Sequence, residues 1–376
     1  MNNLTGLIPI LYAALQIVSR ELVGMIPATS RNMTANGAAT GQVIRVPVTP
    51  ETTNIDITPG TAPATPGTQF GFVDMMITKN RIAQPITWTG DEEISVGGSL
   101  NQMLINQYAQ AMRSLVNEVE IDVCTEAALG AASAGNVWGT AGVTPFATNL
   151  SDLARVKKIM DDRGTPMSDR HLIINTTVGA ALRSLEKLTR VNEAGENDML
   201  RRGVIHDLMG YAIRESAGFQ TVNPGAGTTF TISAAATAGS TSIAISGLDG
   251  DLNKGAIIMI AGNYYAVLAD VASTGTIINI SPALVEDIAS GATGTVISAF
   301  LPSVAFSRDF IYLATRTPAM PRQGDDAKDV TTITDPVSGL SFQVALYGAY
   351  RQSRIEIGLA WGQKAVNKRH GCLLLG

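Results

Sequence analysis

Few of the 376 residues are of the types that carry out chemistry in enzymes or hold metals. The three histidines, His171, His206 and His370, lie far apart and lack the short spacing of metal-binding motifs. The two cysteines, Cys124 and Cys372, form no disulfide framework and no paired metal motif, so we expect buried, reduced thiols. No nucleophile elbow, phosphate-binding loop or metalloprotease motif occurs in the sequence.

One segment, Asp249–Gly255, begins like a calcium-binding loop. Its sixth position is Lys254 where the loop needs glycine, and its twelfth is Ile260 where the loop needs glutamate, so we interpret it as a polar turn. The adjacent acid pairs Glu92–Glu93 and Asp161–Asp162 are expected to point to different faces of their elements. The sequence therefore predicts no catalytic residue, no cofactor-binding residue and no metal site, which argues against an enzyme.

The composition describes an ordered globular protein with an unusually small share of charge. Hydrophobic residues make up 45% and charged residues 16% of the chain. A chain that buries much of its surface against copies of itself needs fewer charges. The formal net charge of −5 argues against a nucleic-acid reader, which needs a basic stripe, but is compatible with a protein that only encloses nucleic acid.

The sequence also carries no sign of export or membrane insertion. Its beginning lacks the basic region and cleavage site of a signal peptide. No apolar run reaches the roughly 18 residues of a membrane helix. We expect a soluble protein that is made inside the cell.

The element that must position the rest is a long helix predicted over Ser99–Leu129. This stretch contains no glycine or proline, and apolar residues recur in it at helical spacing. Ser99 followed by Gln102 predicts a capping box at its start, and Gly130 predicts its end. At 1.5 Å per residue the helix would be about 46 Å long, long enough to act as a spine on which sheets are mounted.

Before this helix, the sequence predicts an arm and a projecting hairpin. Gly6–Ile26 has the pattern of an amphipathic helix that ends before Pro27, and a polar connector follows at 28–41. Gln42–Val48 and Val73–Trp88 are predicted strands, joined by a nearly uncharged tip rich in Thr, Pro and Gly. An isolated hairpin is marginally stable in water, so we expect a partner to cover it, with a plain mobile loop as the alternative.

After the long helix, the pattern is that of a mixed helix and strand unit. Its predicted elements are the helix Leu150–Asp162, the strand His171–Asn175, the helix Thr177–Thr189, the short helix Val204–Met209 and the strand Tyr211–Glu215. From Pro302 onward we expect a strand through Phe306, a helix at Asp309–Leu313, and strands at Ser341–Tyr347, Arg354–Trp361 and Lys364–Leu375.

Between these units the composition changes abruptly, from about Gly227 to Ala299. Short strands with turn signals between them are predicted at Thr229–Ser233, Thr241–Ser246, Ala256–Ala261, Tyr264–Ala269, Thr276–Ile280 and Thr295–Ser298. Evenly spaced short strands favour a small closed barrel or sandwich, here inserted into the surrounding unit.

Five blocks, in order along the chain, resemble the major capsid (coat) proteins of tailed double-stranded-DNA bacteriophages, in the P-twenty-two-like branch. They are Ile8–Leu11 with Ser19–Gly24, Met76–Arg81 with Trp88–Glu93, Gln107–Arg113 with Asn117–Glu120, Ala305–Asp309 with Leu313–Arg316 and Pro318, and Asp335–Leu340 with Ala360–Gly362.

The resemblance implies an α+β chain with the HK-ninety-seven-type capsid fold: a spine helix, an extended hairpin and an inserted β-barrel. It assigns residues 1–41 to an N-terminal arm, 42–95 to the extended loop and 96–144 to a peripheral domain with the spine helix. Residues 145–224 would form the axial domain, 225–301 the inserted barrel, and 302–376 the returning strands of both domains. Some capsids of this fold are cross-linked through a lysine on the extended loop; no lysine occurs between Val46 and Thr78, so we expect no such cross-link.

The function implied is that of a major capsid protein, which self-assembles as hexamers and pentamers into an icosahedral head around packaged double-stranded DNA. Its partners would be copies of itself, a scaffolding protein and a portal, with no specific DNA binding, no cofactor and no membrane. It would be located in the virion and assembled in the host bacterial cytoplasm. Two alternatives stay open: the shell of a cellular nanocompartment, and a β-rich adhesion protein with the barrel as its binding head.

Overall fold

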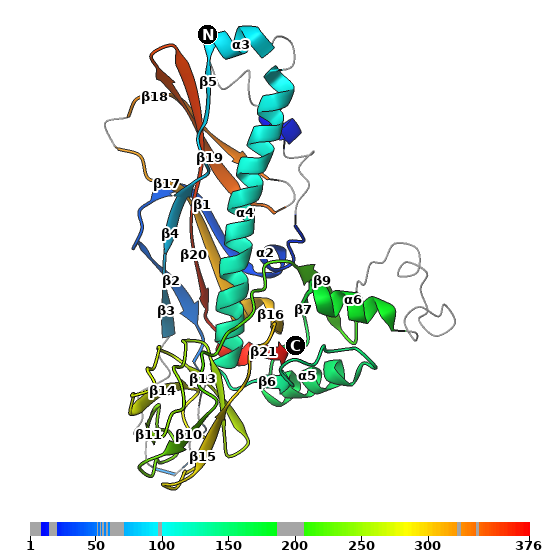
Figure 1. Cartoon of the computed structure of the whole chain (residues 1–376), viewed down its shortest axis with the longest axis vertical. Coiled ribbons are helices and arrows are strands. Elements are labelled where there is room, and N and C mark those ends of the chain that lie inside the picture. The colour runs from blue at the N-terminus through cyan, green and yellow to red at the C-terminus, as the bar shows by residue number, and fades with distance from the viewer. Residues whose placement is uncertain are drawn as a thin grey trace.

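The computed structural model describes residues 9–14, 21–50, 52, 54, 56–57, 59–60, 71–96, 100–185, 207–321, 325–335 and 338–376. A long helix, two large sheets, a closed barrel and a two-stranded hairpin make up most of this part of the chain (Figure 1). The long helix α4 lies along a seven-stranded sheet, with the barrel beside its C-terminal end. Within the described residues no helix is both long and apolar enough to cross a membrane.

The larger sheet is built around its longest strand, β20, which pairs with β17, β19, β4 and β5. The main order is β1-β17-β20-β19-β18, and all pairings are antiparallel except that of β1 with β17. The bounds are β1 Ser30–Ala38, β4 Lys79–Ile82, β5 Ile86–Thr89, β17 Ile311–Pro318, β18 Ala327–Thr334, β19 Ser341–Ala349 and β20 Gln352–Ala365.

Helix α4 spans Leu100–Ala132 and buries one continuous face. The buried side chains on this face recur every three or four residues: Leu104, Tyr108, Met112, Leu115, Val119 and Val123. Each such side chain stabilises the fold by about 1.5–3 kcal/mol when it is removed from water. The predicted long helix is confirmed, whereas its predicted start at Ser99 lies outside the described residues.

The predicted end of α4 is wrong, because the helix continues through Gly130 to Ala132. A Cβ at Gly130 would lie 2.4 Å from the Cβ of Ala365 on β20 and 3.2 Å from the Phe310 ring. Glycine is therefore needed here for the close approach of the helix to the sheet. A sequence alone does not distinguish this use of glycine from its use as a helix stop.

The N-terminal region also differs from the predicted helix over Gly6–Ile26. Residues 9–14 are helical, 21–24 are not, and a separate short helix, α2, spans Met25–Ala28 and contains Pro27. Proline is tolerated in a first turn, where a backbone N–H has no acceptor within the helix. The predicted polar connector contains strand β1, whose order depends on its pairing with β17 more than on its own β-propensity.

The predicted hairpin exists, but its second strand is shorter than expected. Strands β2 (Val43–Val48) and β3 (Gly71–Met76) form a separate antiparallel pair. The rest of the predicted run, Val73–Trp88, breaks into β4 and β5, which return to the larger sheet on either side of Pro85. Most of the predicted tip lies outside the described residues.

A second sheet of six strands lies on the other side of α4, with helices α5 (Ser151–Asp162) and α6 (Thr176–Ser184) packed on it (Figure 1). Its order is β6-β21-β16-β7-β9-β8, with bounds β6 Val137–Gly139, β7 Arg170–Asn175, β8 Asp207–Leu208, β9 Tyr211–Ser216, β16 Ser303–Ser307 and β21 Gly371–Leu375. Alternate residues of the central strands enter two different cores, which explains why these strands are buried along their whole length.

Three predicted helices near this sheet need correction. The helix predicted at Val204–Met209 is wrong at its end, because Asp207–Leu208 form strand β8. The helix predicted at Thr177–Thr189 is shorter than expected, since α6 ends at Ser184. The predicted helix Asp309–Leu313 is a single 3-10 turn, Arg308–Phe310, followed by β17. Strand β17 pairs with β1 on one side and with β20 on the other. These pairings decide the structure here, although the apolar residues of this short stretch are spaced as in a helix.

The predicted barrel is confirmed as a closed barrel of six strands in the order β10-β11-β14-β13-β12-β15. The strands are β10 Thr229–Ile232, β11 Ser242–Ser246, β12 Ile257–Ile260, β13 Asn263–Val267, β14 Ile277–Ser281 and β15 Thr293–Val296. The barrel has a hydrophobic core of its own. Two connecting segments, one around Val222 and one around Phe300, attach it to the rest of the chain, and we call them the two chain crossings. They pair with each other, since Val222 N donates to Phe300 O at 2.9 Å.

We predict that Gly130→Ala destabilises the protein. In an exposed helix this change adds about 1 kcal/mol of stability, but here the new methyl group would overlap Ala365. Overpacking of this kind costs about 1–3 kcal/mol, so we expect a net loss in the free energy of unfolding measured by urea denaturation.

The control is the double variant Gly130→Ala/Ala365→Gly, which restores the missing space and should recover most of the loss. A Gly130→Ala protein that is as stable as the unmodified chain would show that α4 and β20 do not approach as closely as described.

Candidate subunit interface

The two described histidines each contact a single acid instead of grouping around a site. His171 is buried, and its Nε2 lies 3.0 Å from Asp169 Oδ1. Burial lowers the pKa of His171. The Nδ1 of His370 lies 2.7 Å from Asp309 Oδ2. His206 falls outside the described residues.

Both cysteines are free and buried, as expected from the sequence. Cys124 lies on α4 with its Sγ 3.5 Å from Ser216 Oγ, and Cys372 lies in β21. Burial raises the pKa of Cys124 well above its usual range and that of Cys372 to about 12. Both thiols are therefore protonated at neutral pH and are poor nucleophiles. No group of three metal-ligating side chains occurs in the described part of the chain.

The acids of the segment that resembles a calcium loop bind backbone amides of separate turns. The carboxylate of Asp249 accepts the N–H of Thr228 at 2.7 Å and that of Thr229 at 3.1 Å. Asp251 accepts the N–H of Ser273 at 2.6 Å. Because these oxygens are directed to different backbone groups, they hold the barrel turns in place and do not converge on one point.

The adjacent acid pairs are likewise used in local structure. Glu92 accepts the N–H of Thr89 at 2.8 Å and so completes a capping box at the start of helix α3 (Gly90–Val96). The other pair separates into two ion pairs, Asp161 with Arg170 at 2.7 Å and Asp162 with Lys158 at 2.5 Å.

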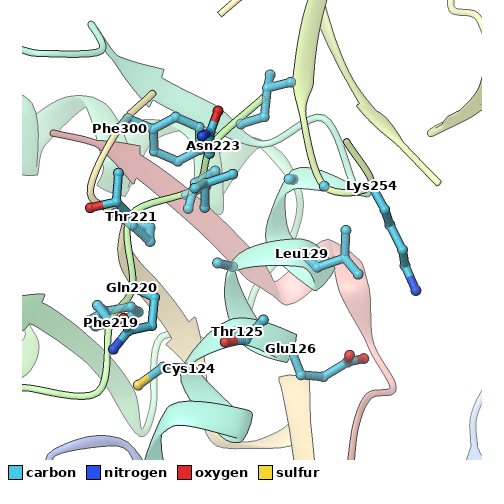
Figure 2. Close-up of a pocket in the computed structure, with 17 residues that line it drawn as sticks. Cys124, Thr125, Glu126, Leu129, Phe219, Gln220, Thr221, Asn223, Lys254 and Phe300 are labelled. Carbon is cyan, nitrogen blue, oxygen red and sulfur yellow. The ribbon is translucent and has the colours of Figure 1, made fainter. Parts of the chain in front are cut away.

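A cavity of about 440 Å³ lies where the barrel joins the body, between α4 and the two chain crossings (Figure 2). Lys254 and Glu126 extend toward the same side of it, and Glu126 accepts the N–H of Ala365 at 3.1 Å. Its lining is mainly apolar, with Phe219, Val222 and Phe300 from the crossings. The polar groups do not converge on a common point, so the cavity marks a junction between units.

The hairpin β2–β3 has two different faces. Its inner face packs on the larger sheet, where Val46 and Met75 join a cluster with residues of β17 and β20. Its outer face pairs Val43 with Met76 and Pro47 with Phe72, on either side of the ion pair Arg45–Asp74. Phe72 is 61% exposed and Met76 is 53% exposed. Apolar side chains gathered in this way mark a surface suited to a partner.

A second exposed surface lies at the far end of the molecule, where α3 meets the turn between β19 and β20 (Figure 1). Tyr350 in this turn is 92% exposed, and Ile94 on α3 is 82% exposed. The groove between the start of α3 and the turn carries both signs of charge, with Asp91 on α3 and Arg351 in the turn. A second copy of this surface could meet it with opposite charges facing each other.

The edges of the larger sheet add to these surfaces. In the described residues β18 pairs only with β19, and β1 pairs only with β17. A strand edge of this kind leaves backbone donors and acceptors that another chain can pair.

We predict that Asp249 contributes to stability only above acidic pH. Hydrogen bonds lower the pKa of Asp249 to about 2, and the hydrogen bond from the Thr228 hydroxyl has the largest effect. A carboxyl with a lowered pKa stabilises the folded state above its ordinary pKa, and this contribution is lost as the pH falls toward 2.

Asp249→Asn should therefore lower the melting temperature at pH 7, with a difference that shrinks between about pH 4 and pH 2. The exposed Asp326→Asn serves as the control and should change little. A difference that is constant with pH would show that the Asp249 charge has no role.

No protein-family model and no curated protein matches the sequence. Solved structures match it over nearly its whole length. A structure from Mycobacterium phage Che8 covers 96% of this chain and 90% of its own, at 16% identity and a TM-score of 0.46. The virus-like particle from Pyrococcus furiosus covers 98% of each chain, at 10% identity and a TM-score of 0.41.

The capsid structure of cyanophage P-SCSP1u has the higher TM-score, 0.52, at 11% identity, and covers 96% of this chain and 90% of its own. This match extends over the long helix, both sheets and the barrel region together, since so little of either chain is left out. The chain therefore has the α+β fold of a phage capsid protein, as the sequence predicts.

Proposed function

We propose that the protein is a major capsid protein that self-assembles into a closed icosahedral shell. The observation that carries the proposal is the apolar outer face of hairpin β2–β3 on a chain with a phage capsid fold. A monomer gains nothing from two exposed apolar pairs on a two-stranded hairpin, whereas a shell buries them at every contact.

In the proposed shell, each hairpin lies on a neighbouring copy. The surface formed by α3 and the turn between β19 and β20, which carries both signs of charge, contacts a further copy. A single contact of this size is weak, but each subunit makes several, so the closed shell is stable. The domain assignment, the HK-ninety-seven-type architecture and the arrangement in hexamers and pentamers belong to this proposal. The lack of lysine between Val46 and Thr78 supports assembly without a cross-link from the extended loop.

The contents and partners of the shell are also part of the proposal. The net charge of −5 favours an inner wall that encloses double-stranded DNA without binding it tightly. A scaffolding protein and a portal are the expected partners during assembly in the host cytoplasm, and the virion is the expected final location.

The experiment that tests the proposal is sedimentation and negative-stain electron microscopy of the chain expressed alone and with a scaffolding partner. Closed particles, spirals or tubes would support a shell protein. A monomer under both conditions would contradict it. The nucleic-acid content of purified particles distinguishes a virus head from the shell of a protein compartment.

We predict that Met76→Asp abolishes assembly while leaving the subunit folded. Met76 is 53% exposed on the outer face of the hairpin, so a charge there meets water in the monomer and an apolar partner in the shell. The measurement is the fraction of protein in particles, together with the melting temperature of the unassembled subunit.

The matched control is Met167→Asp, since Met167 is a methionine 77% exposed in the connection between α5 and β7. Normal particles from Met76→Asp, with the same yield as from Met167→Asp, would exclude the outer face of the hairpin from the interface.

A further inference from the structure

A buried carboxylate on α4 binds two parts of the chain that lie far apart in sequence. Glu120 is 2% exposed. Its Oε1 accepts the N–H of Gly24 at 2.9 Å and that of Met25 at 2.7 Å, and its Oε2 accepts the N–H of Ile26 at 3.0 Å. The same Oε1 accepts the hydroxyl of Ser216, at the end of β9, at 2.6 Å.

The backbone around this carboxylate fits it closely. A Cβ at Gly218 would lie 2.8 Å from Glu120 Cγ, so only glycine leaves room for the Glu120 side chain. The N–H of Gly218 also donates to Ser216 Oγ at 3.0 Å. The N-terminal segment pairs directly with this region as well, because Ala217 N donates to Leu22 O at 3.0 Å.

Hydrogen bonds alone stabilise this charge. In the described part of the chain, the ion pairs made by α4 involve Arg113, Glu118 and Asp122 and not Glu120. Burial raises the pKa of Glu120, and the four hydrogen bonds act in the opposite direction. A buried carboxylate that loses one of these donors loses part of its only solvation. The remaining donors must then move to compensate.

We propose that Glu120 couples the N-terminal segment 21–28 to the six-stranded sheet, so that a change at one is transmitted to the other. The coupling arises because the same oxygen, Oε1, accepts the backbone N–H groups of Gly24 and Met25 and the hydroxyl of Ser216. It is a property of the single chain and does not depend on shell formation. In a shell it links the position of the N-terminal arm to the orientation of the six-stranded sheet.

A second acid fixes the same segment at the surface and is distinct from this coupling. Glu21 accepts the Nε–H of Arg113 at 2.8 Å, and this contact lowers the pKa of Glu21 to about 2. Glu21 joins the segment to α4 only, whereas Glu120 joins it to α4 and to β9. The coupling therefore predicts an effect of Ser216 on the segment that Glu21 does not transmit.

The test is native-state hydrogen exchange of the Met25 and Ile26 amides in the full chain with Ser216→Ala. Ser216 contacts neither amide, and Glu120 is the side chain that joins it to both. The other contact with the segment is the hydrogen bond from Ala217 N to Leu22 O, so exchange of the Ala217 amide is followed in parallel and should change less than that of Met25 and Ile26. A hydrogen bond to a charged group contributes more than one between neutral groups, so we expect exchange at these amides to become about tenfold faster or more.

The matched control is Ser303→Ala, a buried serine of the same sheet whose Oγ accepts the N–H of Asn175 at 3.2 Å and has no contact with Glu120. Exchange at Met25 and Ile26 should be unchanged in this variant. Unchanged exchange in Ser216→Ala, or an equal increase in both variants, would overturn the coupling. Glu120→Gln, where it folds, should accelerate exchange at Met25, Ile26 and Gly218 together.

Discussion

The packing of helix α4 against β20 is the contact on which the rest of the structure depends. An isolated helix is marginally stable in water, and α4 gains its stability from the face that it buries. Its C-terminal turns carry small residues, among them Ala127, Gly130 and Ala131, which allow the sheet to approach closely. The same turns contact β16, β21 and the barrel, so the position of α4 relative to β20 determines where the six-stranded sheet and the barrel lie.

The polar residues of α4 are distributed according to the helical period. Glu118 and Asp122, four residues apart, lie on one side, and Lys79 Nζ is 2.9 Å from a carboxylate oxygen of each. Trp361 on β20 donates its ring N–H to Asp122 at 2.9 Å. Glu120, between them in sequence, faces another side of the helix and holds the N-terminal segment. Three acids within five residues thus connect α4 to the larger sheet, the N-terminal segment and the six-stranded sheet. A shift of one residue along the helix would break all of these contacts.

Sequence patterns predict the elements whose stability is local or whose periodicity is strong. The face of α4 from Leu104 to Val123 and the six barrel strands could be recognised in this way. The patterns fail where a neighbour decides the structure. Strand β1 forms because β17 pairs with it, and residue 130 inside the helix is glycine because Ala365 occupies the space of a side chain. The role of Glu120 could not be predicted at all, since its partners lie about 95 residues away on either side along the chain.

The candidate interface follows from how the chain uses its polar groups. Acids and histidines of the described structure bind amides, arginines and other side chains, as Asp249 and Asp309 illustrate. What remains free on the hairpin is an apolar outer face around the Arg45–Asp74 ion pair. The inner face is anchored on the larger sheet, and a Cβ at Gly362 would lie 2.0 Å from Met76 O, which shows how closely the hairpin crosses β20. A hairpin held firmly on one face and apolar on the other is a rigid surface prepared for a neighbour, and binding there costs little conformational entropy because the strands are already ordered.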